Sequence, residues 1–202
     1  MAIRAVIFDI GGVLLQQNER ELAQEWEQRL KLRPGELNIL LNKSGSGTAT
    51  VGKMSVHDVW QRLGERLGLS EEQTLELENG FVPKDTLNAE LADFLQSLRP
   101  GRTTALLSNA WPGTREALSS KFGLDKMADT MIFSYEVGLA KPDIKIYQLV
   151  VHRLGINPEE TIFLDNKIVN VEAAQLVGIR AILYKDNEQA IAAIQKQLDR
   201  GR

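Results

Sequence analysis

Polar side chains follow several apolar runs of this 202-residue chain, each at the point where the run ends. The first run, residues 3–8, ends at a single carboxylate, Asp9. Similar positions further along the chain hold a hydroxyl, two amides, an ammonium and a second carboxylate: Ser108, Asn109, Lys141, Asp165 and Asn166. Such a set suits attack on a phosphoryl group, because a carboxylate can act as the nucleophile while a cation and hydrogen-bond donors hold the equatorial oxygens. The groups can do this only if the fold gathers them in one place.

The hydrophobic pattern indicates which elements would position them. Runs rich in branched or apolar residues predict strands at residues 3–8, 103–107, 131–133, 161–164 and 180–184. Helical stripes lie between them, such as Leu87, Leu91, Phe94, Leu95 and Leu98. This alternation predicts an α/β fold with a doubly wound parallel sheet and right-handed crossovers. Ligands bind at the C-terminal strand ends of such sheets, so the polar residues should meet in one crevice.

Residues 16–85 break this alternation, with successive helical patterns and no strand signal. We therefore expect a Rossmann-like core formed by residues 1–15 and 86–202, and an inserted α-helical subdomain formed by residues 16–85. Because the insertion follows the first strand, it should lie over Asp9 as a lid.

Three tryptophans and one polar stretch allow finer expectations. Trp26 and Trp60 belong to apolar helical stripes, so they should pack inside the insertion. Trp111 comes directly after the SNA of LLSNA and should form a wall of the site. The stretch SGSGTATVGK, residues 44–53, is expected to be a flexible loop by its composition.

Composition limits the classes of protein that fit. The chain is 43% hydrophobic and 25% charged, as expected for a globular protein. A net charge of −3 without a basic patch argues against a nucleic-acid partner. No run approaches the roughly 20 apolar residues that a membrane-spanning helix needs. The absence of cysteine fits a reducing compartment, and no signal peptide is visible, so we expect a cytoplasmic location.

Four motifs in this order resemble those of the haloacid dehalogenase (HAD) superfamily of hydrolases. They are FDIGGVL, LLSN, the lysine of AKPD, and FLDNKIVNVEAA, and the resemblance covers nearly the whole chain. The helical insertion is similar to the cap of the first subfamily. DxGGVL with SNA resembles a phosphatase-like branch that includes sugar-phosphate phosphatases and the N-terminal domain of mammalian soluble epoxide hydrolase.

The resemblance implies a role for each matching residue. Asp9 would attack phosphorus and carry it as an aspartyl phosphate, Ser108 would bind phosphate, and Lys141 would neutralise charge. The remaining substrate contacts would come from Gly11, Gly12, Asn109 and Trp111. Mg²⁺ would be bound by Asp9, the backbone carbonyl of Gly11, Asp165 and Asn166. The expected substrate is a small phosphorylated metabolite, and the expected state is a monomer or a homodimer.

Two residues depart from the family pattern. Gly11 lacks the carboxylate that supplies a general acid and base in the family, and Asn166 stands where the subfamily usually has a metal-binding carboxylate. An amide oxygen attracts Mg²⁺ less than a carboxylate does, so metal affinity should be reduced. Two alternatives stay open: a metal-independent 2-haloacid dehalogenase, and a catalytically weakened homologue that binds a ligand.

Overall fold

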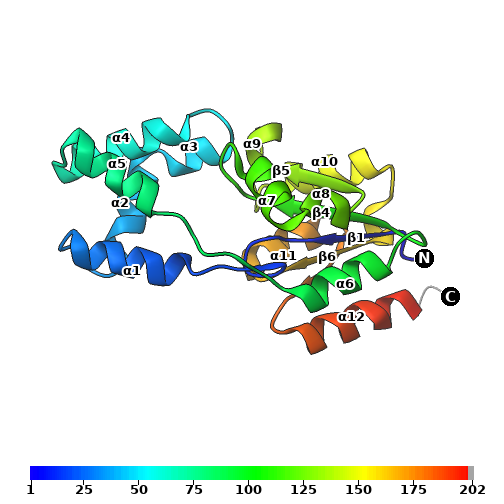
Figure 1. Ribbon diagram of the computed structural model, residues 1–202. Helices are drawn as coiled ribbons and strands as arrows, with labels where there is room; N and C mark the ends of the chain where they lie inside the picture. The colour runs from blue at the N-terminus through cyan, green and yellow to red at the C-terminus, as the bar shows by residue number, and fades with distance from the viewer. Residues whose placement is uncertain (200–202) are drawn as a thin grey trace.

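A computed structural model describes residues 1–199 and confirms the predicted parallel α/β sheet. Five strands lie in the order β5, β4, β1, β6 and β7, and every neighbouring pair is parallel (Figure 1). Their bounds are β1 Ala5–Phe8, β4 Thr103–Ser108, β5 Thr130–Phe133, β6 Thr161–Asp165 and β7 Arg180–Leu183. The hydrophobic runs therefore predicted all five strands to within two residues at either end.

Helices cover both faces of the sheet because successive strand residues point to opposite sides. On β1, Val6 and Phe8 belong to one apolar cluster and Ile7 belongs to the other. Four helices contribute to the first face: α6 Ala89–Ser97, α7 Thr114–Phe122, α8 Leu124–Met127 and α12 Asn187–Asp199. The second face packs against α10 Ile144–Leu154 and α11 Ile168–Leu176. Two short segments complete the core, α9 Ser134–Val137 and the 3₁₀ turn η1 Pro158–Glu160.

The segment between β1 and α6 forms a separate group of helices, which we call the helical module (Figure 1). It contains α1 Glu19–Arg29, α2 Glu36–Ser44, α3 Ser46–Thr50, α4 Val56–Leu67 and α5 Glu71–Gly80. Its own apolar cluster includes Trp26 and Trp60, as their positions in helical stripes predict. The module is thus held by a core distinct from that of the sheet.

The expectation of a flexible loop at residues 44–53 is wrong for its middle. Residues 46–50 form α3, which follows α2 after a left-handed turn at Gly45 (φ 108°). Ala49 is fully buried in the cluster of the helical module. Burial of this alanine against neighbouring helices outweighs the weak helix propensity of a Gly- and Ser-rich stretch.

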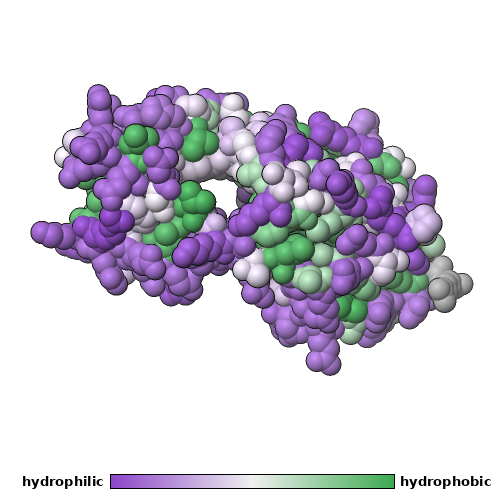
Figure 2. Space-filling view, in the orientation of Figure 1, coloured by the Kyte–Doolittle hydropathy of each residue, from purple (hydrophilic) through white to green (hydrophobic). Residues whose placement is uncertain are grey.

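Two linkers join the helical module to the core. They pair as a short antiparallel ribbon of β2 Leu15–Gln16 and β3 Thr86–Leu87, which the hydrophobic pattern did not reveal. The module also contacts the core away from the linkers, where Gly52 lies against the backbone carbonyl of Tyr135. Figure 2 shows an opening between the module and the sheet domain on this face. Within the described residues, every helix is too short or too polar to cross a membrane.

Candidate active site

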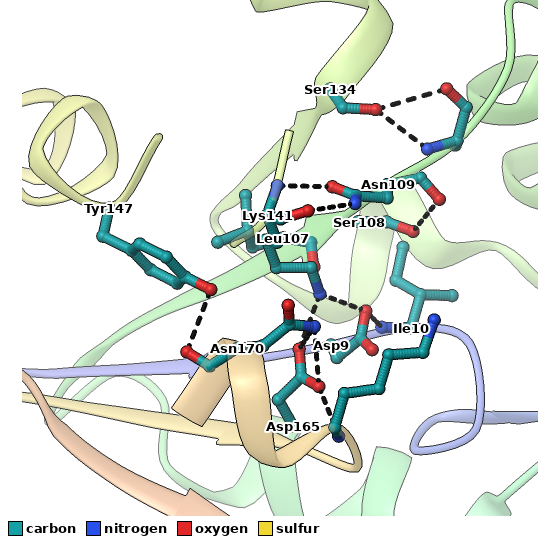
Figure 3. Close-up of polar contacts among 12 residues, drawn as sticks. Asp9, Ile10, Leu107, Ser108, Asn109, Ser134, Lys141, Tyr147, Asp165 and Asn170 are labelled. Carbon is teal, nitrogen blue, oxygen red and sulfur yellow. Dashed lines mark hydrogen bonds and ion pairs between the residues drawn. The ribbon is translucent and has the colours of Figure 1, made fainter. Parts of the chain in front are cut away.

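The C-terminal ends of the central strands bring the predicted polar residues together (Figure 3). Asp9 follows β1, Ser108 ends β4 and Asp165 ends β6, and β1 pairs with both of the other strands. Asp9, Ser108 and Lys141 line a cleft of about 1370 Å³ that extends to the helical module. A parallel sheet therefore assembles residues that lie as much as 156 positions apart in the sequence, Asp9 and Asp165.

Lys141 is shared between the two carboxylates. Its Nζ lies 2.7 Å from Asp9 Oδ1 and 2.8 Å from Asp165 Oδ2, and it donates to the carbonyl of Leu107 at 3.0 Å. All three charged side chains are buried. Burial raises the pKa of the Asp9 carboxyl above its ordinary value, and the Lys141 ammonium opposes that rise. One cation thus balances two anions in a site that excludes most water.

The carboxylate of Asp165 is held by donors on every side. In addition to Lys141, it accepts two hydrogen bonds from Asn170 Nδ2, both of 3.0 Å, and one from the backbone N–H of Lys167 at 2.8 Å. Tyr147 in turn donates its hydroxyl to the carbonyl of Asn170 at 3.0 Å. Both oxygens of Asp165 are therefore engaged, and this carboxylate fixes the position of Lys141.

Sequence reasoning missed Asn170, which binds Asp165 directly, and Tyr147, which supports the backbone of Asn170. Asn170 lies in the first turn of α11 and Tyr147 lies on α10, so neither follows a strand. In the sequence Asn170 is one amide in the FLDNKIVN segment, and only the structure shows that it is buried.

Asn109 fastens the loop that carries the lysine. Its side chain donates to the backbone carbonyl of Lys141 and accepts from the backbone N–H of Lys141, each at 2.8 Å. Ser134, which sequence reasoning also missed, accepts a hydrogen bond from the N–H of Ala110 at 2.9 Å. Ser108 Oγ makes only a 3.4 Å contact with the carbonyl of Asn109, so its hydroxyl can turn toward a ligand in the cleft. The strand end thus positions both Lys141 and Ser108.

Amide side chains pack against Gly11 and Gly12, the two glycines that follow Asp9 and Ile10. Gly12 has φ +76°, and the side chain of Asn166 stands where a Cβ at this position would lie. The side chain of Gln17 stands in the corresponding place beside Gly11. Asn166 is therefore close to the backbone that follows Asp9, although it is exposed.

Asp9 itself keeps one oxygen available. Its Oδ1 accepts from the backbone N–H of Ile10 at 2.7 Å as well as from Lys141, whereas Oδ2 accepts no hydrogen bond from residues 1–199. Those residues also contain no group of three His, Cys, Asp or Glu side chains that could hold a metal ion. Of the two buried carboxylates, Asp9 alone has an oxygen without a hydrogen bond to residues 1–199, because both oxygens of Asp165 accept bonds from Lys141, Lys167 or Asn170.

The walls of the cleft carry an aromatic ring and further charges. Trp111 lines the cleft, as predicted, and its ring centroid lies 6.0 Å from that of Trp60 in the helical module. Glu19 at the start of α1 also lines the cleft. Desolvation raises the pKa of its carboxyl, and the Lys167 ammonium opposes the rise.

Comparison with known proteins gives a consistent picture. The family model described as haloacid dehalogenase-like hydrolase matches residues 3–178. Bifunctional epoxide hydrolase 2 from Sus scrofa is 28% identical over 97% of this chain, which spans only 39% of the length of that protein. D-ribitol-5-phosphate phosphatase from Bacteroides thetaiotaomicron is 25% identical over 87% of this chain and 89% of its own length.

Solved structures share the fold. A HAD-like family hydrolase from Porphyromonas gingivalis has a TM-score of 0.78 and 28% identity, and 98% of each chain is covered. A HAD family enzyme from Bacteroides thetaiotaomicron, solved in complex with magnesium and inorganic phosphate, has a TM-score of 0.73 and 24% identity over 91% of this chain and 95% of its own.

Proposed function

This chain belongs to the haloacid dehalogenase-like hydrolases, and we propose that it hydrolyses phosphate monoesters of small metabolites through an aspartyl phosphate at Asp9. The observation that carries the proposal is the state of the Asp9 carboxylate. One of its oxygens is fixed by Ile10 and Lys141, and the other has no donor among residues 1–199 while the side chain lines the cleft. A carboxylate held in this way is aimed and still has an oxygen with which to attack.

The reaction proceeds in two substitutions at phosphorus. In the first, Asp9 Oδ2 forms a bond to phosphorus, the bond from phosphorus to the ester oxygen breaks, and the leaving group departs as an alkoxide or aryloxide. In the second, water attacks phosphorus, the bond to Asp9 breaks, and inorganic phosphate leaves.

Two residues support the charge that develops during these steps. The Lys141 ammonium already touches the nucleophile, so it can follow negative charge from Asp9 onto the phosphoryl oxygens. The Ser108 hydroxyl can donate to a phosphoryl oxygen from the neighbouring strand end. Gly11 offers no side chain to protonate the leaving oxygen.

The residues at this site could bind Mg²⁺, but only weakly. Mg²⁺ prefers oxygen donors and is often bound by one or two carboxylates together with substrate phosphate and several waters. The carboxylate of Asp9, the Gly11 carbonyl and the Asn166 amide would hold it, whereas Asp165 acts through Lys141. Bound there, the ion would neutralise charge on the transferring phosphoryl group. With one protein carboxylate, affinity should depend strongly on the phosphate that binds beside it.

Phosphate release from an aryl phosphate by the purified chain tests this proposal. We expect turnover that requires added Mg²⁺ and stops on addition of a chelator. Two controls address the alternatives: chloride release from 2-chloropropionate without metal would identify a dehalogenase, and tight binding of inorganic phosphate without any turnover would identify a ligand-binding homologue. Either result would overturn the phosphatase assignment. A screen of phosphorylated metabolites would then define the substrate.

A further inference from the structure

The space left by the missing side chain of Gly11 is filled from elsewhere in the chain. The amide carbon and nitrogen of Gln17 lie 3.3 and 3.9 Å from the position that a Gly11 Cβ would take, and the amide oxygen, Oε1, is nearer still. The carboxyl oxygens of an aspartate at position 11 would lie two bonds from that Cβ, in the same region. An amide oxygen therefore stands where the family pattern places an acid and base.

The orientation of this amide is fixed by its second contact. Gln17 Nε2 donates to Asp85 Oδ1 at 3.2 Å. An ionised carboxylate only accepts hydrogen bonds, so the nitrogen must face Asp85 and the oxygen must face Gly11. The two residues lie at the module ends of β2 and β3, and a neighbouring bond from the Lys84 N–H to Asn18 Oδ1, 2.6 Å long, holds the same two linkers together.

Gln17 is also accessible to the water molecules that would fill the cleft. Gln17, Gly11 and Asp9 line the same cleft, and the Gln17 side chain is exposed within it. Its amide oxygen cannot donate a proton to a leaving group, but it can accept a hydrogen bond from water. A glutamine amide that orients an attacking water is a known solution in enzymes that hydrolyse phosphoryl groups.

We propose that Gln17 is a positioning residue that holds the water molecule which hydrolyses the aspartyl phosphate. This inference rests on the proposed function and concerns its second step alone. The water oxygen forms a bond to phosphorus, the bond from phosphorus to the Asp9 oxygen breaks with its electron pair returning to the carboxylate, and both water protons leave on dihydrogen phosphate. Gln17 takes up no proton and acts only through orientation.

The experiment follows decay of the phosphorylated enzyme directly. The parent and Gln17→Ala are loaded with a radiolabelled aryl phosphate, chased with unlabelled substrate and quenched at intervals. We expect Gln17→Ala to slow the decay by about tenfold to a hundredfold, because a misplaced reactant costs up to about that factor. Its kcat/KM for the aryl phosphate, which reports the first step, should stay within about twofold of the parent value. Gln16→Ala, at the adjacent residue that ends β2 and lies outside the cleft, is the matched control and should decay like the parent.

A double substitution at Gln17 and Asp85 should raise the decay rate above that of Gln17→Ala, and an unfolded protein could not show such an increase. Gln17→Glu combined with Asp85→Asn keeps a hydrogen bond between the two side chains and places a carboxylate beside Gly11. This pair should restore or exceed the parental decay rate, because the carboxylate can also accept a proton from water.

Each failure has a distinct meaning. Unchanged decay in Gln17→Ala, or an equal fall in kcat and kcat/KM without accumulation of phosphoenzyme, would overturn the role of Gln17. Absence of any phosphoenzyme and of any phosphate release in the parent would instead reject the proposed function itself. Thermal melting of every variant verifies that the compared proteins are folded.

Discussion

Among the individual residues, Lys141 imposes the strongest constraint because its single ammonium serves two buried carboxylates. A buried anion without full compensation is costly, and burial accordingly raises the pKa of Asp9. Asp165 has further donors from Asn170 and Lys167, whereas Asp9 has, among residues 1–199, only the N–H of Ile10 besides the lysine. Asp9 is therefore the less well compensated of the two carboxylates, which suits the electron-pair donation that we propose for it.

Replacement of the nucleophile should separate activity from stability. Asp9→Asn should abolish turnover, since an amide oxygen is a far poorer nucleophile than a carboxylate. It should not lower the free energy of unfolding, because one ammonium then faces one carboxylate. The control is Asp165→Asn, whose new amide would point donors at those of Asn170 and Lys167 and should cost about 1–3 kcal/mol. Denaturant unfolding and phosphate release test both variants, and hydrolysis near the parental rate in folded Asp9→Asn would remove Asp9 from the mechanism.

The metal site offers a gain-of-function change. Asn166→Asp should tighten Mg²⁺ binding in the absence of phosphate, because it adds a negative oxygen beside a divalent cation. The side chain is exposed next to Gly12, so the substitution disturbs no buried contact. Calorimetric titration of Mg²⁺ into both proteins gives the comparison. Equal or weaker affinity in the variant would show that this side chain does not face the cation.

Leaving-group dependence should expose the absence of an acid at Gly11. A positioned acid contributes about a hundred- to ten-thousand-fold, mostly for basic leaving groups. We expect kcat/KM to fall steeply from aryl phosphates, acyl phosphates and sugar 1-phosphates to primary alkyl esters such as sugar 6-phosphates. A flat dependence would mean that another group supplies the proton.

The reverse change needs a compensating one. Because the Gln17 amide occupies the space beside Gly11, Gly11→Asp should be made together with Gln17→Ala. Relative to Gln17→Ala alone, the double variant should raise kcat/KM for alkyl phosphate esters more than for aryl phosphate esters.

At the level of secondary-structure elements, the first turn of α11 anchors Lys141 through Asp165. Asn170→Ala should lower the free energy of unfolding by about 1–3 kcal/mol and reduce kcat, since two hydrogen bonds to a buried carboxylate are lost. Tyr147→Phe is the control, because it removes one hydroxyl bond to the Asn170 backbone and leaves Asp165 untouched. We expect it to cost about 1 kcal/mol and to leave kcat nearly unchanged. Equal losses of kcat in the two variants would argue against the anchoring role.

The sequence predicts features that arise from local patterns, but it does not predict side-chain contacts between residues far apart in the chain. Strands and their polar ends could be predicted, because periodicity and the geometry of parallel sheets act locally; this places Asp9, Ser108 and Asp165 at one edge. Asn170 could not be distinguished from an ordinary helical amide. The Gln17–Asp85 bond joins residues 68 positions apart through strands of only two residues, too short for any pattern.

For the molecule as a whole, we expect a contact far from the linkers to govern how the helical module is placed over the cleft. At Gly52 (φ +71°) a Cβ would strike the backbone carbonyl of Tyr135, which cannot move aside as a side chain can. Gly68 provides a matched control, because it has φ +66° but nothing within 4 Å of its Cβ position.

Both alanine variants should lose about 1–2 kcal/mol of unfolding free energy through backbone strain. Only Gly52→Ala should also raise KM, because only it displaces the module from the core. Steady-state kinetics and denaturant unfolding on the two proteins separate these effects. Similar KM values in both variants would show that this contact does not govern access to the cleft.

The separate apolar core of the helical module has an evolutionary consequence. Its packing residues, such as Trp26 and Leu63, belong to a different cluster from those that support the strands. Mutations that reshape the module can therefore accumulate during evolution without disturbing the residues at the strand ends. The same division makes residues 18–84, which leave Gln17 and Asp85 with the core, a natural unit for exchange among relatives in the laboratory. Chimaeras joined there should inherit chemistry from one parent and selectivity from the other.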